Sequence, residues 1–335
     1  MALSESGFIK MTISNMNILV TGGAGFIGST LIDQLLANEN NYVISIDNYD
    51  SFYDRSIKIQ NQENHFLSNN FEFHELDIRN INSYDPGRSI DCIIHLAAKA
   101  GVRPSISNPK EYFDVNVNGT LEMLEFARKH EVKQFLFASS SSVYGINSNI
   151  PWSENDSDLQ PISPYASSKL ACEKIGYTYS HLFGIRFIAL RFFTVYGPRQ
   201  RPDLAINLFF RKILNGESIE MFGDGKTYRD YTFVMDIVSG IQSAINYVDR
   251  NYIVVNLGNN NPVCLSDLIQ AISTVSGVVP TINKVGEQLG DVPRTCANVN
   301  LAESLWNFKP NTSLADGLML QFEWYKMMMD GTKNN

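Results

Sequence analysis

Residues 17–28 have the sequence Asn17-Ile-Leu-Val-Thr-Gly22-Gly-Ala-Gly25-Phe-Ile-Gly28, and this stretch decides the fold. Its first part, Asn17–Val20, is typical of a buried strand, and the pattern that follows, Ile27–Leu36, is typical of a helix. Between them occur both Gly-x-Gly-x-x-Gly and Gly-x-x-Gly-x-x-Gly. Such glycines permit a tight turn and let the backbone approach a pyrophosphate at the positive N-terminus of the helix. The stretch therefore predicts a dinucleotide-binding turn.

An acidic residue at the end of the second predicted strand supports this interpretation. Asp47 directly follows Tyr42–Ile46, about 20 residues beyond the last glycine, which is the position that this turn requires. A carboxylate there should accept hydrogen bonds from the ribose hydroxyls of adenosine and repel a 2′-phosphate, so the sequence favours NAD over NADP. Asp77 and Ile78 follow the third predicted strand, Phe71–Leu76. Asp77 is either a contact to the adenine or an ordinary turn residue.

Short apolar runs continue to alternate with helical patterns through the first half of the chain. Further strands are predicted at Cys92–Leu96, Gln134–Ala138 and Ile185–Phe192, and a further helix at Tyr112–Lys129. This alternation predicts an α/β fold with a Rossmann-like, doubly wound parallel sheet. His95 lies at the end of a buried strand, so we expect it to be a packed structural residue.

The composition excludes several classes of function. Lys and Arg number 27 against 35 Asp and Glu, a net charge of −8, and no basic stretch could follow a phosphate backbone, so we expect no nucleic-acid partner. No apolar run approaches the ~20 residues of a membrane span, so we expect no membrane contact. The four cysteines are scattered without a CxxC pair, and the histidines form no metal-binding group. These features predict a cytoplasmic protein without a bound metal.

A Tyr-x-x-x-Lys pair, Tyr165 and Lys169, follows Ser163 and Pro164. The serine can cap a helix and the proline suits its first turn, which places the tyrosine and the lysine on one helix face. An ammonium group near a phenol favours the phenolate and lowers its pKa, so the tyrosine can act as a general base near neutral pH. The preceding strand ends in hydroxyl residues, Ser139–Ser142, at the edge where an open parallel sheet binds ligands.

In order and spacing, these motifs resemble those of the extended short-chain dehydrogenase/reductases across nearly all of residues 16–328. The resemblance also rests on two further segments, His95-Leu-Ala-Ala98 and Asn116-Val-Asn-Gly-Thr120. It implies that Ser140, Tyr165 and Lys169 are catalytic, as in the sugar epimerases of that family. It also implies a bound NAD, for which the expected contacts are Gly22, Gly25, Phe26, Ile27, Gly28, Asp47, Asn48, Asp77, Ile78, Leu96, Ala97, Ala98, Lys99, Asn116, Tyr165 and Lys169.

The two residues after Ser140 separate the subfamilies. Sugar 4,6-dehydratases have an Asp-Glu pair there and UDP-glucuronate decarboxylases have a glutamate, whereas this chain has Ser141 and Ser142. Without a carboxylic acid–base, the simplest chemistry is removal and return of a hydride, which is epimerisation at C4 of a UDP-sugar. A decarboxylase, a 4,6-dehydratase and an NAD-binding protein without catalysis are the alternatives.

The segment from Arg191 to Ala205 carries the sharpest substrate signal. UDP-galactose 4-epimerases have an asparagine where Thr194 stands, and Thr194 followed by Gly-Pro-Arg-Gln-Arg-Pro-Asp resembles the UDP-glucuronate 4-epimerases. The resemblance implies that Thr194 and Arg201 hold the sugar carboxylate, which would disfavour loss of CO₂ from a 4-keto uronate. Alternatively, Arg199 and Arg201 are solvated or pair with acidic neighbours. UDP-glucuronate is the predicted substrate.

Two segments further along resemble the UDP-gripping segments of these enzymes, Tyr228-Arg-Asp-Tyr231 and Gly290-Asp-Val-Pro293. The epimerases of galactose type have an arginine where this chain has Gln288, so a pyrophosphate contact there is not expected. Thr295 stands where a bulky tyrosine excludes N-acetyl sugars from some epimerases, which keeps a UDP-N-acetylglucosamine 4-epimerase as the main alternative. The expected substrate contacts are Ser141, Ser142, Thr194, Arg201, Arg229 (pyrophosphate), Asp291 (uridine ribose) and Thr295.

We expect three parts in the chain. Residues 1–15 are predicted to be a disordered tail, 16–190 an NAD-binding Rossmann domain, and 191–330 a smaller mixed α/β domain that binds the UDP-sugar. The chain is expected to return to the larger domain around 232–258.

The resemblance also bears on assembly. In many relatives the helices at 109–130 and 163–183 form a four-helix bundle between subunits, so we expect a homodimer. Their apolar residues equally suit an ordinary core, and the sequence leaves both interpretations open.

Overall fold

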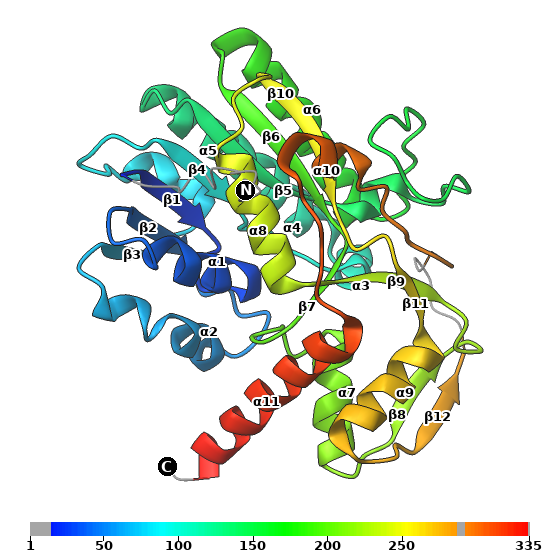
Figure 1. Cartoon of the computed structure of the whole chain (residues 1–335). Helices are drawn as coiled ribbons and strands as arrows, with labels where there is room; N and C mark the ends of the chain where they lie inside the picture. The colour runs from blue at the N-terminus through cyan, green and yellow to red at the C-terminus, as the bar shows by residue number, and fades with distance from the viewer. Residues whose placement is uncertain (1–14, 287–291, 334–335) are drawn as a thin grey trace, which may run out of the picture.

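A seven-stranded parallel sheet forms the centre of the structure, a computed structural model that describes residues 15–286 and 292–333 (Figure 1). Residues 1–14 of the predicted tail and Asp291 lie outside the described residues. The strand order is β10-β6-β5-β4-β1-β2-β3. The strands are β1 (Asn17–Thr21), β2 (Tyr42–Asp47), β3 (Phe71–Glu75), β4 (Cys92–His95), β5 (Gln134–Ser140), β6 (Arg186–Phe192) and β10 (Tyr252–Leu257).

This sheet confirms the predicted Rossmann-like α/β fold. The predicted strands occur with shifts of one or two residues at their ends, and β5 runs on to Ser140. The strand order reverses at β1, which has β2 on one side and β4 on the other. Ligands of open parallel sheets bind beyond the carboxyl ends of the strands at such a reversal. The topology therefore places the glycine turn after β1 at the expected binding edge.

Both faces of the sheet are covered by helices. Ile18 and Val20 of β1 belong to the hydrophobic core that contains α1 (Phe26–Leu36) and α8 (Val234–Ile245), whereas Leu19 belongs to the core on the opposite face. That second core contains side chains of α5 (Gly119–Lys129) and of α6 (Pro164–Phe183). Because successive strand residues point to opposite faces, a strand buried on both sides must be apolar throughout. This requirement explains the continuous apolar runs in the sequence.

The helix predicted at Tyr112–Lys129 is divided in the structure. It consists of α4 (Pro109–Phe113), a π-helical turn η3 (Asp114–Asn118) and α5. Asn116, in the π-turn, donates to the carbonyl oxygen of Lys99 and accepts from the Lys99 amide, at 3.0 and 2.8 Å. The widened turn lets this side chain pair with the backbone after β4, and such turns are frequent at functional sites.

The remaining elements gather mainly around a third core, beyond the carboxyl edge of the large sheet (Figure 1). Phe209, Phe210, Leu268 and Phe322 are among its buried side chains. Two small sheets belong to this region, with the orders β11-β9-β7 and β12-β8. The elements are β7 (Thr194–Tyr196), α7 (Ala205–Leu214), β8 (Ile219–Phe222), β9 (Tyr228–Phe233), β11 (Pro262–Cys264), α9 (Leu265–Ser276), β12 (Ile282–Val285) and α11 (Leu314–Lys333).

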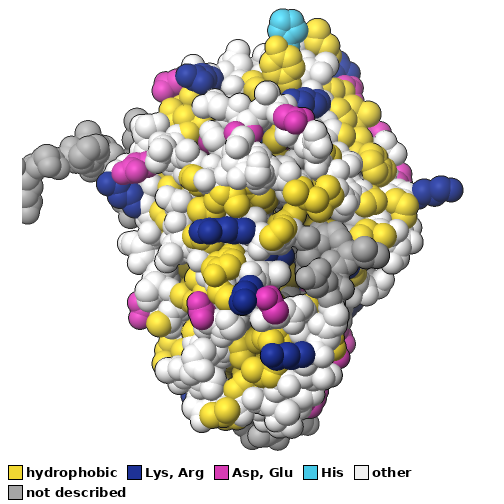
Figure 2. All heavy atoms as spheres, turned by 90° about the vertical axis from the view of Figure 1, so that its right-hand side faces the viewer, with side chains coloured by type: hydrophobic (Ala, Val, Ile, Leu, Met, Phe, Trp, Pro, Cys, Tyr) yellow, Lys and Arg dark blue, Asp and Glu magenta, His cyan; other side chains and the backbone are white. Residues whose placement is uncertain are grey.

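Short helices complete the chain: α2 (Arg55–Gln62), η1 (His65–Leu67), η2 (Ile78–Ser83), α3 (Val102–Ser107), η4 (Ser141–Tyr144) and α10 (Asn300–Trp306). On the face shown in Figure 2, hydrophobic side chains are spread among charged ones, and the Lys and Arg side chains lie apart from one another. Within the described residues, no helix is both long and apolar enough to cross a membrane.

Candidate active site

A cavity of about 520 Å³ lies at the carboxyl edge of the large sheet, between it and the third core. Its walls come from the glycine turn, from the loops after β2, β3 and β4, from the end of β5, from the start of α6 and from the segment after β6. Segments that are distant in the sequence therefore meet at one site, and most of the predicted site residues are among them.

The glycine turn is shaped for close backbone approach. Gly22 has a positive φ of 72°, and a Cβ there would lie 2.8 Å from the backbone nitrogen of Ala97. A Cβ on Gly28 would lie 2.2 Å from the carbonyl oxygen of Gly22. Gly25 precedes α1, and the first amides of a helix have no partner within it. This cradle fits a pyrophosphate, and Gly22, Gly25, Phe26, Ile27 and Gly28 all line the cavity.

Asp47 ends β2 beside this turn and is almost fully buried. Its carboxylate accepts from the amides of Tyr49 and Ala24, at 2.8 and 3.2 Å. Burial raises the pKa of Asp47, and the Lys58 ammonium, 4.0 Å away, is the strongest influence in the opposite direction. Since a carboxylate has about four acceptor sites, Asp47 can also accept the ribose hydroxyls of a dinucleotide.

The loops after β2, β3 and β4 supply most of the other predicted cofactor contacts. Asp77 lines the cavity and also caps η2, accepting from the Arg79 amide at 2.9 Å, so it fills the turn role that the sequence left open. Asn116 is buried behind the cavity wall, where it supports Lys99, and its direct contact to a cofactor stays a prediction. The cavity-lining residues of this group are Asn48, Asp77, Ile78, Leu96, Ala97, Ala98 and Lys99.

The structure brings the three predicted catalytic side chains together at one wall of the cavity. Ser163 caps α6 and accepts from the Ala166 amide at 3.1 Å, so Tyr165 and Lys169 share a helix face as predicted. Ser140, at the end of β5, donates to the Ser142 hydroxyl at 3.1 Å. The Lys169 ammonium donates to the carbonyl oxygen of Ala138 at 2.7 Å.

The charge balance at Tyr165 differs from the expected one. Burial raises the pKa of Tyr165, whereas a hydrogen bond with Ser140 and the charge of Arg201 lower it. Burial also lowers the pKa of Lys169 to about 8. The expected lowering of the tyrosine pKa by its lysine was therefore wrong for the protein alone, because Lys169 is directed to the backbone of β5 and both groups are withdrawn from water.

Four of the predicted substrate contacts line the same cavity as the predicted catalytic residues. Ser141, Ser142, Thr194 and Arg201 all line it. Arg201 forms a bidentate ion pair with Asp203, with Nε–Oδ1 and Nη2–Oδ2 distances of 3.0 and 2.7 Å. Its side chain is only 16% exposed, so it is not a solvated surface arginine. Arg201 therefore does pair with an acidic neighbour, as the alternative interpretation held, and it does so in the cavity wall.

Arg229 and Thr295 reach the cavity from the strands and loops of the smaller sheets. Arg229 donates to the carbonyl oxygens of Tyr228 and Val292, at 2.9 and 2.8 Å. The Thr295 hydroxyl accepts from the Asp230 amide at 3.0 Å.

Sequence reasoning missed part of the wall. Phe52, Tyr53 and Lys58 line the cavity although they come from the loop after β2 and from α2. Trp152 also reaches the wall from the loop before α6, and its side chain is almost fully buried. No local motif marked these residues, because their places depend on how distant segments pack. The aromatic pair Phe52-Tyr53, in the loop that begins after Asp47, was the one available signal.

This sheet and the glycine turn are those of an enzyme that binds a dinucleotide, and the Ser-Tyr-Lys set lies in the same cavity. The chain belongs to the NAD dependent epimerase/dehydratase family, which it matches over residues 18–258. It is 36% identical over 312 residues to the UDP-glucuronate 4-epimerase of Thermodesulfobacterium geofontis, an alignment that covers 92% of this chain and 95% of that protein.

Solved structures of similar proteins agree with this family. The UDP-glucuronic acid 4-epimerase of Bacillus cereus, in complex with UDP-glucuronic acid and NAD, superposes with a TM-score of 0.87 at 34% identity, covering 93% of this chain and all of that one. The UDP-N-acetylglucosamine 4-epimerase of Methanobrevibacter ruminantium, in complex with UDP-N-acetylmuramic acid, gives the same TM-score at 31% identity, covering 95% of this chain and all of that one.

Proposed function

We propose that this chain epimerises UDP-glucuronate at C4 to UDP-galacturonate with a bound NAD. The observation that carries the proposal is the place of Arg201, whose guanidinium shares a cavity with Tyr165, Ser140 and Thr194. A sugar held there can present its C4 hydroxyl to the phenol while its carboxylate meets the guanidinium. The names of the similar proteins support the same substrate.

Each catalytic side chain has a defined task in this reaction. Bound NAD would accept a hydride from C4 and return it to the opposite face of the sugar. Tyr165 takes the proton of the C4 hydroxyl on its phenolic oxygen and gives it back after the sugar has turned. Ser140, which pairs with this tyrosine, holds the reacting oxygen. Lys169 lines the same cavity and would hold the nicotinamide ribose of the bound NAD.

The polar lining of the cavity favours epimerisation over dehydration or decarboxylation. The wall that contains Ser140 continues with the hydroxyl groups of Ser141 and Ser142. Among the described residues, the carboxylates that line the cavity are Asp47 at the end of β2 and Asp50 and Asp77 in the loops after β2 and β3, on the side expected to bind the cofactor. A proton transfer at C5 or C6 would need an acid–base group at the sugar, where the described residues place hydroxyls.

The roles of the two domains and the cellular compartment are part of the same proposal. Residues 16–190, with the segment around 232–258, bind NAD, and 191–330 bind the UDP-sugar. The four cysteines are buried and free, which supports a reducing, cytoplasmic compartment.

Helix α6 supports a homodimer. About half of the surface of three of its apolar residues is exposed, namely Tyr177, Leu182 and Phe183.

A proton NMR time course tests the proposed reaction directly. Purified protein is incubated with UDP-glucuronate and, separately, with UDP-N-acetylglucosamine. The anomeric signal of UDP-galacturonate should appear without any UDP-pentose. UDP-pentose would instead indicate decarboxylation, and a lasting 4-keto product would indicate dehydration.

Replacement of Arg201 tests the carboxylate contact. Arg201→Ala should weaken binding of UDP-glucuronate about 100-fold, because a charge-assisted contact to the sugar carboxylate contributes about 2–3 kcal/mol. Binding of UDP-glucose should change less than about threefold, as measured by calorimetry. Arg199→Ala is the matched control. Arg199 lies in the same loop as Arg201, but it pairs with Asp33 of α1 at 2.6 Å. Equal losses for both sugars would remove Arg201 as the carboxylate contact.

A UDP-N-acetylglucosamine 4-epimerase is the second candidate, and one observation favours it. Thr295 is a small residue in the cavity wall, which leaves room for an N-acetyl group. Turnover of the N-acetyl sugar alone would keep the fold and the catalytic residues but overturn the roles of Thr194 and Arg201.

A further inference from the structure

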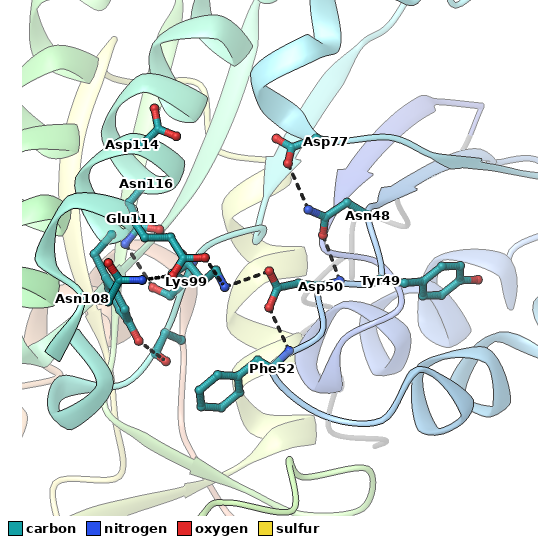
Figure 3. A network of polar contacts seen from close by, with 12 residues as sticks. Asn48, Tyr49, Asp50, Phe52, Asp77, Lys99, Asn108, Glu111, Asp114 and Asn116 are labelled. Carbon is teal, nitrogen blue, oxygen red and sulfur yellow. Dashed lines mark hydrogen bonds and ion pairs between the residues drawn. The ribbon is translucent and has the colours of Figure 1, made fainter.

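The loop between β2 and α2, residues 48–54, is tied across the cavity by an ion triad (Figure 3). The Lys99 ammonium lies 2.9 Å from a carboxylate oxygen of Asp50 and 2.6 Å from one of Glu111. Asp50 belongs to this loop, Lys99 follows β4, and Glu111 is on α4. Lys99 is only 15% exposed, so the two contacts are partly shielded from solvent. Partial shielding strengthens ion pairs relative to the surface.

The same aspartate also fixes the shape of the loop (Figure 3). Its carboxylate accepts from the Phe52 amide at 3.0 Å, and its own amide donates to the Asn48 side chain at 3.1 Å. Lys58, on α2, donates to the Asp50 carbonyl oxygen at 2.9 Å. The position of Phe52 therefore follows from that of Asp50, which Lys99 holds.

Phe52 in turn lies against Arg201. The Cζ atom of Arg201 is 5.0 Å from the centre of the Phe52 ring, within the range of a cation–π contact. The Asp203 carboxylate accepts hydrogen bonds from Nε and Nη2 of the same guanidinium. Among the described residues, these contacts cover one face and one edge of the guanidinium and leave the Nη1 edge to meet a ligand.

We propose that Phe52 is a specificity-determining residue for a sugar carboxylate, because it fixes the orientation of the Arg201 guanidinium, and that Asp50, Lys99 and Glu111 are positioning residues that hold Phe52 in place. The proposal rests on the proposed function, since it takes Arg201 as the carboxylate contact. It assigns the loop after the ribose-binding aspartate to the substrate as well as to the cofactor.

The test compares the binding of two sugars that differ in the carboxylate. NAD-loaded protein with the background substitution Tyr165→Phe is titrated by calorimetry with UDP-glucuronate and with UDP-glucose. Phe52→Leu should weaken UDP-glucuronate binding about tenfold, because the cation–π contact is lost, and UDP-glucose binding less than about twofold. Phe52→Tyr keeps the aromatic face and should bind both sugars as the background protein does.

Three further variants separate specificity from general damage. Asp50→Asn should weaken binding of UDP-glucuronate selectively, about threefold, because the loop loses its ion pair with Lys99 while its aromatic ring remains. In a protein that also carries Arg201→Ala, Phe52→Leu should have no further effect on UDP-glucuronate. Phe66→Leu is the matched control, since Phe66 is another exposed phenylalanine, in η1 and outside the cavity lining.

The outcomes distinguish this inference from the proposed function. Suppose that the background protein prefers UDP-glucuronate. The inference alone is then overturned if Phe52→Leu lowers the affinity for both sugars equally or for neither. It is also overturned if Phe52→Leu still lowers the affinity for UDP-glucuronate in the protein that carries Arg201→Ala. If the protein with Tyr165 neither prefers nor turns over UDP-glucuronate, the proposed function and the inference fall together.

Discussion

At the scale of single residues, the proposed reaction depends on the surroundings of the Tyr165 phenol. Tyr165 is buried enough for its pKa to rise, and Ser140 and Arg201 act against that rise. The Lys169 ammonium donates to the carbonyl oxygen of Ala138, which fixes its position between α6 and β5. A base in this setting depends on its neighbours, because water does not stabilise the phenolate.

Tyr165→Phe tests this residue with minimal structural change. Turnover should fall at least about 1,000-fold, within the range expected for loss of a general acid–base group. NAD content, measured after denaturation of the purified protein, should stay at the wild-type level. Tyr177→Phe on the same helix is the matched control, since Tyr177 is more than half exposed. Near-wild-type activity of Tyr165→Phe would exclude the tyrosine as the base.

At the scale of elements, we expect cofactor binding to depend on the contact between the glycine turn after β1 and the start of α1. The helix begins directly beyond the glycine turn, and Gly28 lets its first turn pack on the Gly22 carbonyl oxygen. A methyl group there would meet backbone atoms, which cannot move aside as a side chain can. The N-terminus of the helix would have to shift away from the pyrophosphate that it is expected to bind.

Gly28→Ala should therefore lower NAD affinity at least tenfold, equal to about 1.4 kcal/mol. The measurement is NAD content after purification, followed by titration with NAD monitored by protein fluorescence. Gly286→Ala is the control, because a Cβ on Gly286 would meet none of the described residues within 4 Å. Unchanged NAD binding in Gly28→Ala would show that the turn tolerates the shift.

At the scale of the whole molecule, a series of buried hydrogen bonds joins the end of β1, beside the glycine turn, to helix α6. The Thr21 hydroxyl lies 2.7 Å from Nδ1 of His95, and the Thr120 hydroxyl 3.2 Å from its Nε2. Thr120 donates to the carbonyl oxygen of Asn116, whose side chain donates to the Ser168 hydroxyl on α6 at 2.9 Å. Since the Thr120 proton is already used, His95 donates from Nε2 and accepts at Nδ1. The neutral imidazole satisfies both partners, which confirms His95 as a structural residue.

This arrangement predicts a pH dependence of stability. Burial, with a smaller effect from Lys169, lowers the pKa of His95 from 6.5 to about 3. Between these values the unfolded chain binds a proton that the folded protein does not, so the free energy of unfolding decreases as pH falls below 6.5. Between pH 7 and pH 5 the wild type should lose about 2 kcal/mol more than His95→Asn, as measured by urea unfolding. Parallel losses in both proteins would rule out His95 as the source.

What the sequence determined by itself is local. The strand, glycine turn and helix of residues 17–36, the aspartate after β2 and the capped helix with Tyr165 and Lys169 all follow from neighbouring residues, because apolar periodicity and turn chemistry act over a few positions. The order of these motifs was enough to predict the parallel sheet. The assignment of Arg201 to the substrate depended instead on the resemblance of its segment to the UDP-glucuronate 4-epimerases.

Only the tertiary structure decided what lies across the cavity. The π-turn at Asn116 interrupts a sequence that has helical periodicity, because its side chain pairs with the backbone of Lys99. The direction of the Lys169 ammonium depends on β5, which is distant in the sequence. Phe52 reaches Arg201 because the loop after β2 and the segment after β6 meet at one edge of the sheet. Such contacts depend on packing between elements, and no periodicity within either segment encodes them.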